Sequence, residues 1–367
     1  MAKKNEYGYN IVTEDAVTES SFLIENDSKV LGNVDSQLPD WNVTTDVSSL
    51  KKYLLVAAIN YENPNADSFI NQLNNYKLKI KDKKSSAIII VDMHKGTIRT
   101  VIEGKKDTVE YYEPITKLNY PSGRTFDAIG KTNYITKETI YDIIEKIGAN
   151  APGTLQDVCI FSHAYWQGPI LANSKITDPL DIDMRISDIS PIVIDYLQFK
   201  SAFTSTGIFK IFGCQSHPPF NYLLKSVMQN PKYKKNGSTL DTEEFVVKDI
   251  RIPKPHGGVY DPVSTFVDSS LFTDIGGGKI KFTFLQIKTI FSDQYCLSFA
   301  AKLASEVDIT VQYSLPATYA SFGSPEYFRI SKDTEMNVPF FNTYLGIRIG
   351  ELNYGIYDRP TILRLTP

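Results

Sequence analysis

The sequence predicts an α/β fold built on a mostly parallel sheet. Three segments support this prediction: the apolar runs 86–92 and 158–161, and the strand-like segment 208–212, which is apolar except for Lys210. A continuous apolar run indicates a strand that is buried on both faces, as in a parallel sheet covered by helices. Segments with helical spacing of apolar residues lie between the runs. Strands and helices therefore alternate along the chain, which is typical of α/β proteins.

Length and composition narrow the class of protein. The chain has 367 residues, which suggests about two domains of ~150 residues. Hydrophobic residues make up 42% and charged residues 22%, so the chain has the means to bury a core. The 39 Lys and Arg against 42 Asp and Glu argue against a dedicated nucleic-acid binder. Three cysteines are too few for a disulfide framework and fit reduced thiols in the cytoplasm.

The first 50 residues are polar and predict an extended arm, which would become ordered on a partner protein. No apolar run follows Lys3 and Lys4, so this segment is not a secretory signal peptide. The apolar stretches 54–59 and 87–91 are far shorter than the ~20 residues of a membrane helix. We therefore expect a cytoplasmic protein without a membrane partner. Export by a route that needs no signal peptide stays open.

The first elements of the core follow this arm. Residues 54–59 predict a strand or a short helix, and 67–76 have helical spacing. The lysine-rich stretch 77–84 predicts a solvated loop before the buried strand 86–92. The segments 97–102 and 108–112 predict a hairpin next to that strand.

The middle of the chain has the most regular pattern. Thr136 is the expected N-cap of a helix whose apolar stripe is Ile140, Ile143, Ile144 and Ile147. Gly148 is the expected end of this helix. After it, the pattern predicts strand 158–161, helix 192–199, strand 208–212 and helix 220–228.

The rest of the chain divides into an insertion and a return to the core. Residues 230–290 lose the alternating pattern and predict an insertion of loops and hairpins, after a core that spans 51–229. Residues 291–367 are expected to complete the core. They contain a predicted helix at 295–304, a strand at 307–313 and further strands at the sheet edge.

Two candidate catalytic residues follow neighbouring strands. His163 comes just after the strand 158–161, and Cys214 just after the strand 208–212. In an open parallel sheet, residues beyond the carboxyl ends of the strands line the functional crevice. A cysteine acts as a nucleophile as its thiolate, and a nearby histidine lowers the thiol pKa and carries the proton. The placement therefore predicts a Cys–His site for nucleophilic catalysis.

The two blocks Val-Cys-Ile-Phe-Ser-His163 and Ile-Phe-Lys-Ile-Phe-Gly-Cys214 resemble the caspase-like cysteine peptidases, which include caspases, clostripain, gingipains, legumain and separase. His163 and Cys214 are 51 residues apart, and in caspases the histidine lies ~50 residues before the cysteine. The resemblance covers about 85–220 and the later unit 295–313. It implies a three-layer caspase-like fold and a cysteine peptidase that acts on a protein or peptide.

The resemblance also implies roles for neighbouring residues. The N–H groups of Ala164 and Cys214 would form the oxyanion hole, with Gly213 and Gln215 flanking the nucleophile. Asp183 and Arg185 would line a pocket for a basic side chain, as acidic residues do in relatives specific for Arg or Lys; a solvated loop is the alternative. The sequence departs from the family at Ala164, where glycine is usual. It also has Phe-Gly-Cys-Gln-Ser in place of Gln-Ala-Cys-Arg-Gly.

Other interpretations of these residues stay open. Cysteine is often buried for packing alone. Cys214 and His217 are half of a zinc site, but no second Cys/His cluster exists to complete it, and we expect no metal. Gly276–Gly278 and Lys279 do not match a phosphate loop, so no cofactor is expected. A weaker enzymatic alternative is an α/β-hydrolase arrangement, with Cys214 as nucleophile and His256 as base.

The second function class is a protein that keeps the fold without catalysis. It would be a structural, effector or cargo protein of a bacterial assembly such as a contractile injection system. The alanine at position 164, the polar arm and the aromatic C-terminal region favour this class. An open groove at Cys214 would favour the enzyme, and a buried, inaccessible Cys214 would favour the alternative.

Overall fold

The computed structural model describes residues 49–63, 67–116, 120, 125–126, 133–174, 181–215, 217–254, 258–321 and 329–366. The predicted N-terminal arm lies outside the described residues apart from its last two positions. His256 also lies outside them.

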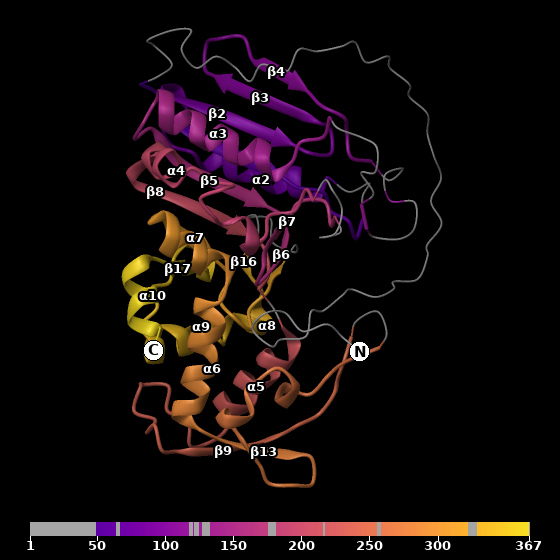
Figure 1. Ribbon diagram of the computed structural model, residues 1–367, viewed down its shortest axis with the longest axis vertical. Helices are drawn as coiled ribbons and strands as arrows, with labels where there is room; N and C mark the ends of the chain where they lie inside the picture. The colour runs from indigo at the N-terminus through magenta and orange to yellow at the C-terminus, as the bar shows by residue number, and fades with distance from the viewer. Residues whose placement is uncertain are drawn as a thin grey trace.

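An eight-stranded sheet forms the centre of the molecule, with the strand order β17-β14-β8-β5-β1-β2-β3-β4 (Figure 1). Its strands are β1 (Lys51–Ala57), β2 (Ser86–Asp92), β3 (Thr97–Ile102), β4 (Thr108–Tyr111), β5 (Leu155–Phe161), β8 (Phe203–Phe212), β14 (Thr310–Tyr313) and β17 (Gly355–Tyr357). The five strands from β2 to β14 are parallel, whereas β17, β3 and β4 add antiparallel pairs at the edges. This confirms the predicted α/β class and is consistent with a caspase-like fold.

Helices cover both faces of the sheet and make it three layers deep. On one face, Tyr76 of α2 (Ser68–Lys79) packs on the ring of Phe212 in β8. On the other face, Phe199 of α4 (Tyr196–Ala202) stacks on Phe209 of the same strand. Phe209 and Phe212 are an odd number of positions apart, so they point to opposite faces of the sheet. The helices α3 (Lys137–Asn150) and α7 (Phe299–Val307) lie on the α4 side (Figure 1).

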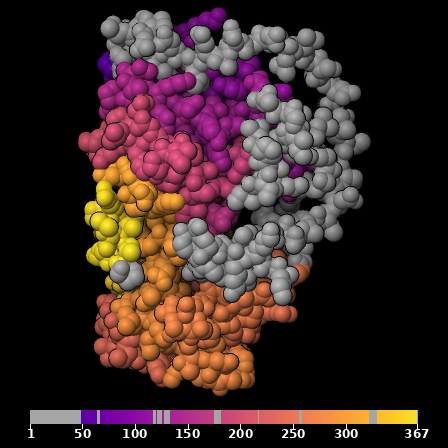
Figure 2. Space-filling view, in the orientation of Figure 1, coloured from indigo at the N-terminus to yellow at the C-terminus, as the bar shows by residue number. Residues whose placement is uncertain are grey.

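Residues 244–283, within the predicted insertion 230–290, build a separate small sheet. It consists of β9 (Glu244–Lys248), β12 (Thr273–Asp274) and β13 (Lys279–Thr283), beside the pair β10 (Ile252–Pro253) and β11 (Val259–Tyr260). Figure 2 shows that this region gathers at the end of the molecule opposite β2–β4. The remaining elements are β6 (His163–Tyr165), β7 (Gly168–Ile170), β15 (Ala320–Ser321), β16 (Arg329–Ile330), α5 (Pro218–Met228), α6 (Phe284–Cys296), α8 (Lys332–Glu335), α9 (Val338–Leu345) and α10 (Arg359–Leu365).

The predicted end of the α3 helix at Gly148 is wrong. The helix begins after Thr136, whose N–H donates to Thr139 Oγ1 at 3.2 Å, and it continues to Asn150. A Cβ at Gly148 would lie 1.8 Å from the carbonyl oxygen of Gln198. Gly148 therefore lets α3 cross α4 closely, which is a packing role that the pattern of one segment does not reveal.

Two further predictions for the C-terminal region also need correction. The predicted single helix 295–304 is two helices, because Ser298 Oγ accepts a hydrogen bond from the N–H of Ala301 and begins α7. The last 40 residues are mainly helical, and among their described strands β17 alone joins the central sheet. Tyrosine and phenylalanine suit strands and buried helix faces alike, so composition did not separate the two.

None of the helices in the described part of the chain has the length and apolar character needed to cross a membrane.

Candidate active site

The carboxyl ends of β5 and β8 bring the two halves of the candidate site to one edge of the sheet. The two strands are parallel, and their last paired residues are Phe161 and Phe212, whose rings stack at 5.0 Å. His163 and Cys214 each lie two residues beyond this pair. The sheet register thus places them at the same level along neighbouring chains.

Gly213 keeps these two chains close after the strands end. A Cβ on Gly213 would lie 2.6 Å from the Cβ of Ala164 and 2.9 Å from the carbonyl oxygen of Ser162. Real Cβ atoms do not approach so closely, so the position needs a residue without a Cβ. Gly213 therefore sets the separation between the segment that bears His163 and the segment that bears Cys214.

His163 is held by residues that follow a third strand end. Its Nε2 lies 2.9 Å from Oδ1 of Asn60, which comes just after β1, the neighbour of β5. The carboxylate of Glu62 lies 4.0 Å from the same nitrogen. The rings of Tyr61 and Phe69 contact the imidazole at centroid distances of 4.6 and 5.3 Å. These neighbours orient the ring, and a hydrogen bond at one imidazole nitrogen determines which tautomer is present.

Sequence reasoning missed Asn60 and Glu62. The available signal was their position just after the strand 54–59, since the carboxyl ends of parallel strands share one edge. The pattern of 54–59 fits a strand or a short helix alike, so the sequence makes no prediction for the residues that follow it.

Cys214 has a different environment. Its Sγ accepts a hydrogen bond from the N–H of Ala320 at 3.3 Å, and the S–H donates to the carbonyl oxygen of Ala320 at 3.8 Å. Burial raises the pKa of the Cys214 thiol to about 11; the Ala320 N–H lowers it and the Glu62 charge raises it further. In this arrangement the group is a neutral thiol at pH 7 and not a nucleophilic thiolate.

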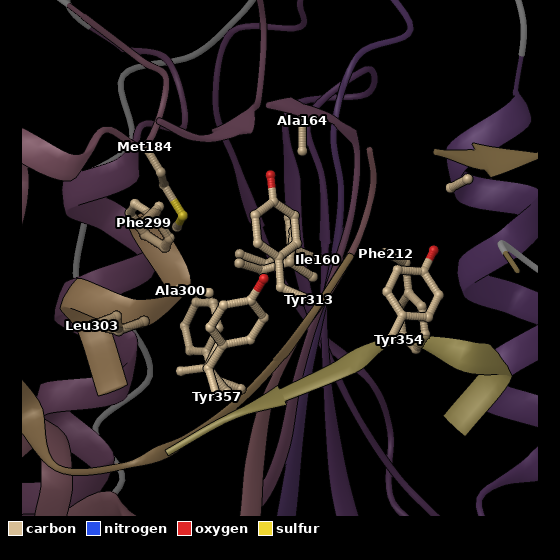
Figure 3. Close-up of a cluster of buried hydrophobic side chains, with 14 of the residues drawn as sticks. Ile160, Ala164, Met184, Phe212, Phe299, Ala300, Leu303, Tyr313, Tyr354 and Tyr357 are labelled. Carbon is tan, nitrogen blue, oxygen red and sulfur yellow. The ribbon is translucent and has the colours of Figure 1, made fainter. Parts of the chain in front are cut away.

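A buried tyrosine fastens the two segments together. The hydroxyl of Tyr313, in β14, donates to the carbonyl oxygen of Tyr165 at 2.6 Å and to that of Cys214 at 3.1 Å. Figure 3 shows the hydroxyl end of the Tyr313 side chain pointing toward Ala164. Tyr165 belongs to the hairpin of β6 and β7 that begins with His163. Tyr313 therefore connects the hairpin 163–170, which we call the histidine hairpin, to the segment 213–215 after β8, which we call the cysteine loop.

Gln215 is buried and its groups have partners within the protein. Its N–H donates to the carbonyl oxygen of Thr318 at 3.2 Å, and its Oε1 accepts from the hydroxyl of Tyr357 at 3.0 Å. These contacts fix the path of the chain after Cys214. The role of Gln215 beside an oxyanion hole stays a prediction.

Asp183 and Arg185 belong to a buried network of charges, so the alternative of a solvated loop is wrong. The Asp183 carboxylate accepts backbone N–H groups from four consecutive residues, 171–174. Arg185 donates to Asp181 at 2.6 Å and to the hydroxyl of Tyr165 at 2.8 Å. Lys137 pairs with Asp181 and Asp188. The network braces the histidine hairpin through Tyr165, and a pocket role for Asp183 and Arg185 stays a prediction.

His217 lies among aromatic side chains at the start of α5. Its ring contacts Phe266 at a centroid distance of 4.4 Å and Phe220 at 5.2 Å, and burial lowers its pKa to about 4. Its Nδ1 is buried without a hydrogen-bond partner. Across the described residues, no group of three or more His, Cys, Asp or Glu side chains is arranged to hold a metal ion.

Comparisons with known proteins add one distant likeness. No family model matches the chain, and no curated protein matches it. A solved structure that it resembles is a secreted C11 cysteine protease from Bacteroides thetaiotaomicron in complex with an irreversible peptide inhibitor. The identity is 12%, the TM-score is 0.27, and the match covers 57% of this chain and 51% of that protein. The matched region thus spans about half of the protease.

Proposed function

We propose that this protein is a cysteine-dependent peptidase that acts through Cys214 and His163. The observation that supports this most is the register of β5 and β8, because both residues lie two positions beyond the same pair at the carboxyl edge of the sheet. A random pair of core residues has no reason to share this position. The polar and aromatic setting of His163 adds support, since Asn60 holds one imidazole nitrogen.

The proposed reaction is acyl transfer from a peptide bond. The Cys214 sulfur attacks the carbonyl carbon, while His163 takes the thiol proton and later gives it to the leaving amine. A water molecule then hydrolyses the thioester, and the free thiol is restored. The N–H groups of Ala164 and Cys214 would stabilise the negative oxygen of the intermediate. Asn60 would act as a positioning residue for the imidazole.

One observation favours a second candidate, a protein that keeps the fold without catalysis. The Cys214 thiol is bonded to Ala320 and its pKa is raised, which is the reverse of what a nucleophile needs. In that case the strand ends would serve only for packing, and the protein would act by binding other proteins as an effector or structural component.

Labelling of the cysteines separates the two candidates. The full chain is treated near pH 7.5 with a peptidyl acyloxymethyl ketone library, and modified sites are mapped by mass spectrometry. We expect Cys214 to be labelled at least tenfold faster than Cys296, which is half-buried and whose pKa is also raised by burial. His163→Ala should slow the labelling of Cys214 by 10²-fold or more, because general-base assistance contributes about that much.

The controls are Cys214→Ala, which should abolish the fast labelling and the hydrolysis of fluorogenic peptides, and Cys296→Ser, which should leave the fast labelling and the hydrolysis unchanged. If Cys214 reacts no faster than Cys296 and His163→Ala has no effect, both in the unaltered chain and in a chain whose segment 317–320 is loosened by Thr334→Val, the peptidase proposal is wrong and the non-catalytic candidate stands.

A further inference from the structure

A short segment after β14 covers the thiol of Cys214. We name Ala317–Ala320 the strap. The N–H and the carbonyl oxygen of Ala320 both face Cys214, because each bonds to its sulfur group, at 3.3 and 3.8 Å. A second contact next to the cysteine joins Thr318 to Gln215, backbone to backbone, at 3.2 Å. The strap thus contacts two consecutive residues, Cys214 through its thiol and Gln215 through its backbone.

The strap is fastened by side chains from the opposite side. The N–H of Tyr319 donates to Thr334 Oγ1 at 3.2 Å, and Asn337 Nδ2 donates to the carbonyl oxygen of Ala317 at 2.8 Å. Thr334 and Asn337 are both fully buried. Ala317 has a φ of +62°, a conformation that alanine adopts only under constraint from its surroundings. The strap is therefore held in place by contacts beyond the thiol itself.

A second fastening lies nearer the surface. Ala320 is the strand partner of Ile330 in β16. Arg329, which precedes Ile330, forms an ion pair with Glu335 at 3.4 Å. Glu335 also accepts a hydrogen bond from Asn353. This group is partly exposed, so a substitution there disturbs the strap with little effect on the core.

We propose that the strap is an autoinhibitory contact that holds Cys214 in a resting state, and that it must move before the thiol reacts. This rests on the proposed peptidase function. In the resting state the N–H and the carbonyl oxygen of Ala320 both hydrogen-bond to the Cys214 thiol. A substrate carbonyl therefore has to displace these two groups before it reaches the sulfur. A signal or partner that moves the strap would then control the activity through access to the thiol.

Weakening the strap should therefore expose Cys214 more often. Thr334→Val keeps the shape of the side chain and removes the acceptor for the Tyr319 N–H. The variant also removes the hydrogen bond from Thr334 Oγ1 to the Ser331 carbonyl oxygen, which lies outside the strap. Loss of the one bond to the strap should raise the open population about fivefold, which corresponds to about 1 kcal/mol. The measurement is the rate of iodoacetamide modification at Cys214 in the full chain at pH 7.5, mapped by mass spectrometry. Glu335→Ala should raise the same rate in the same direction.

The matched control is Lys200→Ala. It breaks an exposed ion pair with Asp308, beside the start of β8, at the opposite end of the strand from Cys214. It should leave the modification rate unchanged. A thermal melt of each variant establishes that it is folded. If Thr334→Val does not fold, Glu335→Ala decides the matter.

The outcomes separate the strap from the peptidase. Unchanged modification rates in the folded strap variants overturn the strap. Faster modification without hydrolysis of any peptide by any variant shows that the strap covers the thiol, but it overturns the peptidase and with it the autoinhibitory role. If the unaltered chain already hydrolyses peptides as fast as the strap variants, the strap is overturned and the peptidase stands.

Discussion

His163 and Cys214, the two halves of the candidate site, differ in the residues that surround them and in what those residues do to their side chains. His163 is surrounded by groups that orient a working imidazole: Asn60 at one nitrogen, Glu62 nearby, and two aromatic rings. Cys214 is a neutral thiol because burial raises its pKa more than the N–H of Ala320 lowers it. Both residues lie at the same level of the sheet, so the sheet does not account for the difference.

This difference shows where control of the site resides. The sheet places both residues, but the loops that follow β1 and β14 decide their chemical states. A histidine with its ring already held needs no rearrangement, whereas a covered thiol does. For the proposed peptidase, the barrier to activity would therefore lie on the cysteine side. The next experiments test first the close approach of the two segments at Gly213, then the surroundings of Cys214, and then those of His163.

The largest loss of stability is expected for Gly213→Ala, because Gly213 lies where the segments of His163 and Cys214 approach each other. The added Cβ would lie 2.6 Å from Ala164 Cβ and 2.9 Å from the Ser162 carbonyl oxygen, so the chains must separate. Overpacking of this kind should lower the free energy of unfolding by about 3 kcal/mol. Urea denaturation of the variant and the unaltered chain measures the difference.

The double variant Gly213→Ala with Ala164→Gly supplies the control. It removes the closest of the two clashing atoms and leaves the contact with Ser162, so it should recover part of the lost stability. A cost below 0.5 kcal/mol for Gly213→Ala, within the usual range for surface substitutions, would show that the chains are not held close here.

An intermediate effect concerns the Cys214 thiol at alkaline pH. The folded pKa of about 11 lies above the ordinary value of 9.0, so folding favours the protonated form. This stabilisation is complete below pH 9 and is lost as pH rises through 11. By pH 10.5, roughly 2 kcal/mol of unfolding free energy should disappear from this group.

Because lysines and tyrosines also titrate in this range, the measurement is a difference. The loss of stability between pH 8 and 10.5 should be smaller in Cys214→Ala than in the unaltered chain by roughly that 2 kcal/mol. Equal losses in the two proteins would mean that Cys214 is not shielded from solvent as the structure indicates.

The smallest effect is expected on the histidine side. Asn60→Ala removes the hydrogen bond to His163 Nε2 and the one from Asn60 Nδ2 to Ser68 Oγ. Because the site is partly exposed, water replaces some of these contacts, and the free energy of unfolding should fall by about 1 kcal/mol. Ser305→Ala, which removes a side-chain hydrogen bond within α7, is the control for the loss of one local bond. A larger loss in Asn60→Ala than in Gly213→Ala would reverse the order proposed for the two halves.

The sequence predicted the sheet well because its strands carry their own signal. The segment 86–92 is a continuous apolar run, and 208–212 is apolar except for Lys210; strands buried on both faces of a parallel sheet are typically rich in such residues. The positions of His163 and Cys214 at strand ends followed from the same runs. The predictions failed at Gly148, where close packing against α4 decides, at Ser298, where a local N-cap begins a second helix, and in the C-terminal region, where aromatic composition fits strands and helices alike.

The sequence by itself thus determined the fold class and the strand ends at which His163 and Cys214 lie, because both depend on local patterns of burial. The tertiary structure alone decided the surroundings of each residue. Asn60 reaches His163 across 103 positions of the chain, and Ala320 reaches Cys214 across 106. Contacts between residues so far apart in the sequence depend on where the whole fold places the loops. The pattern of apolar residues within one segment cannot predict them.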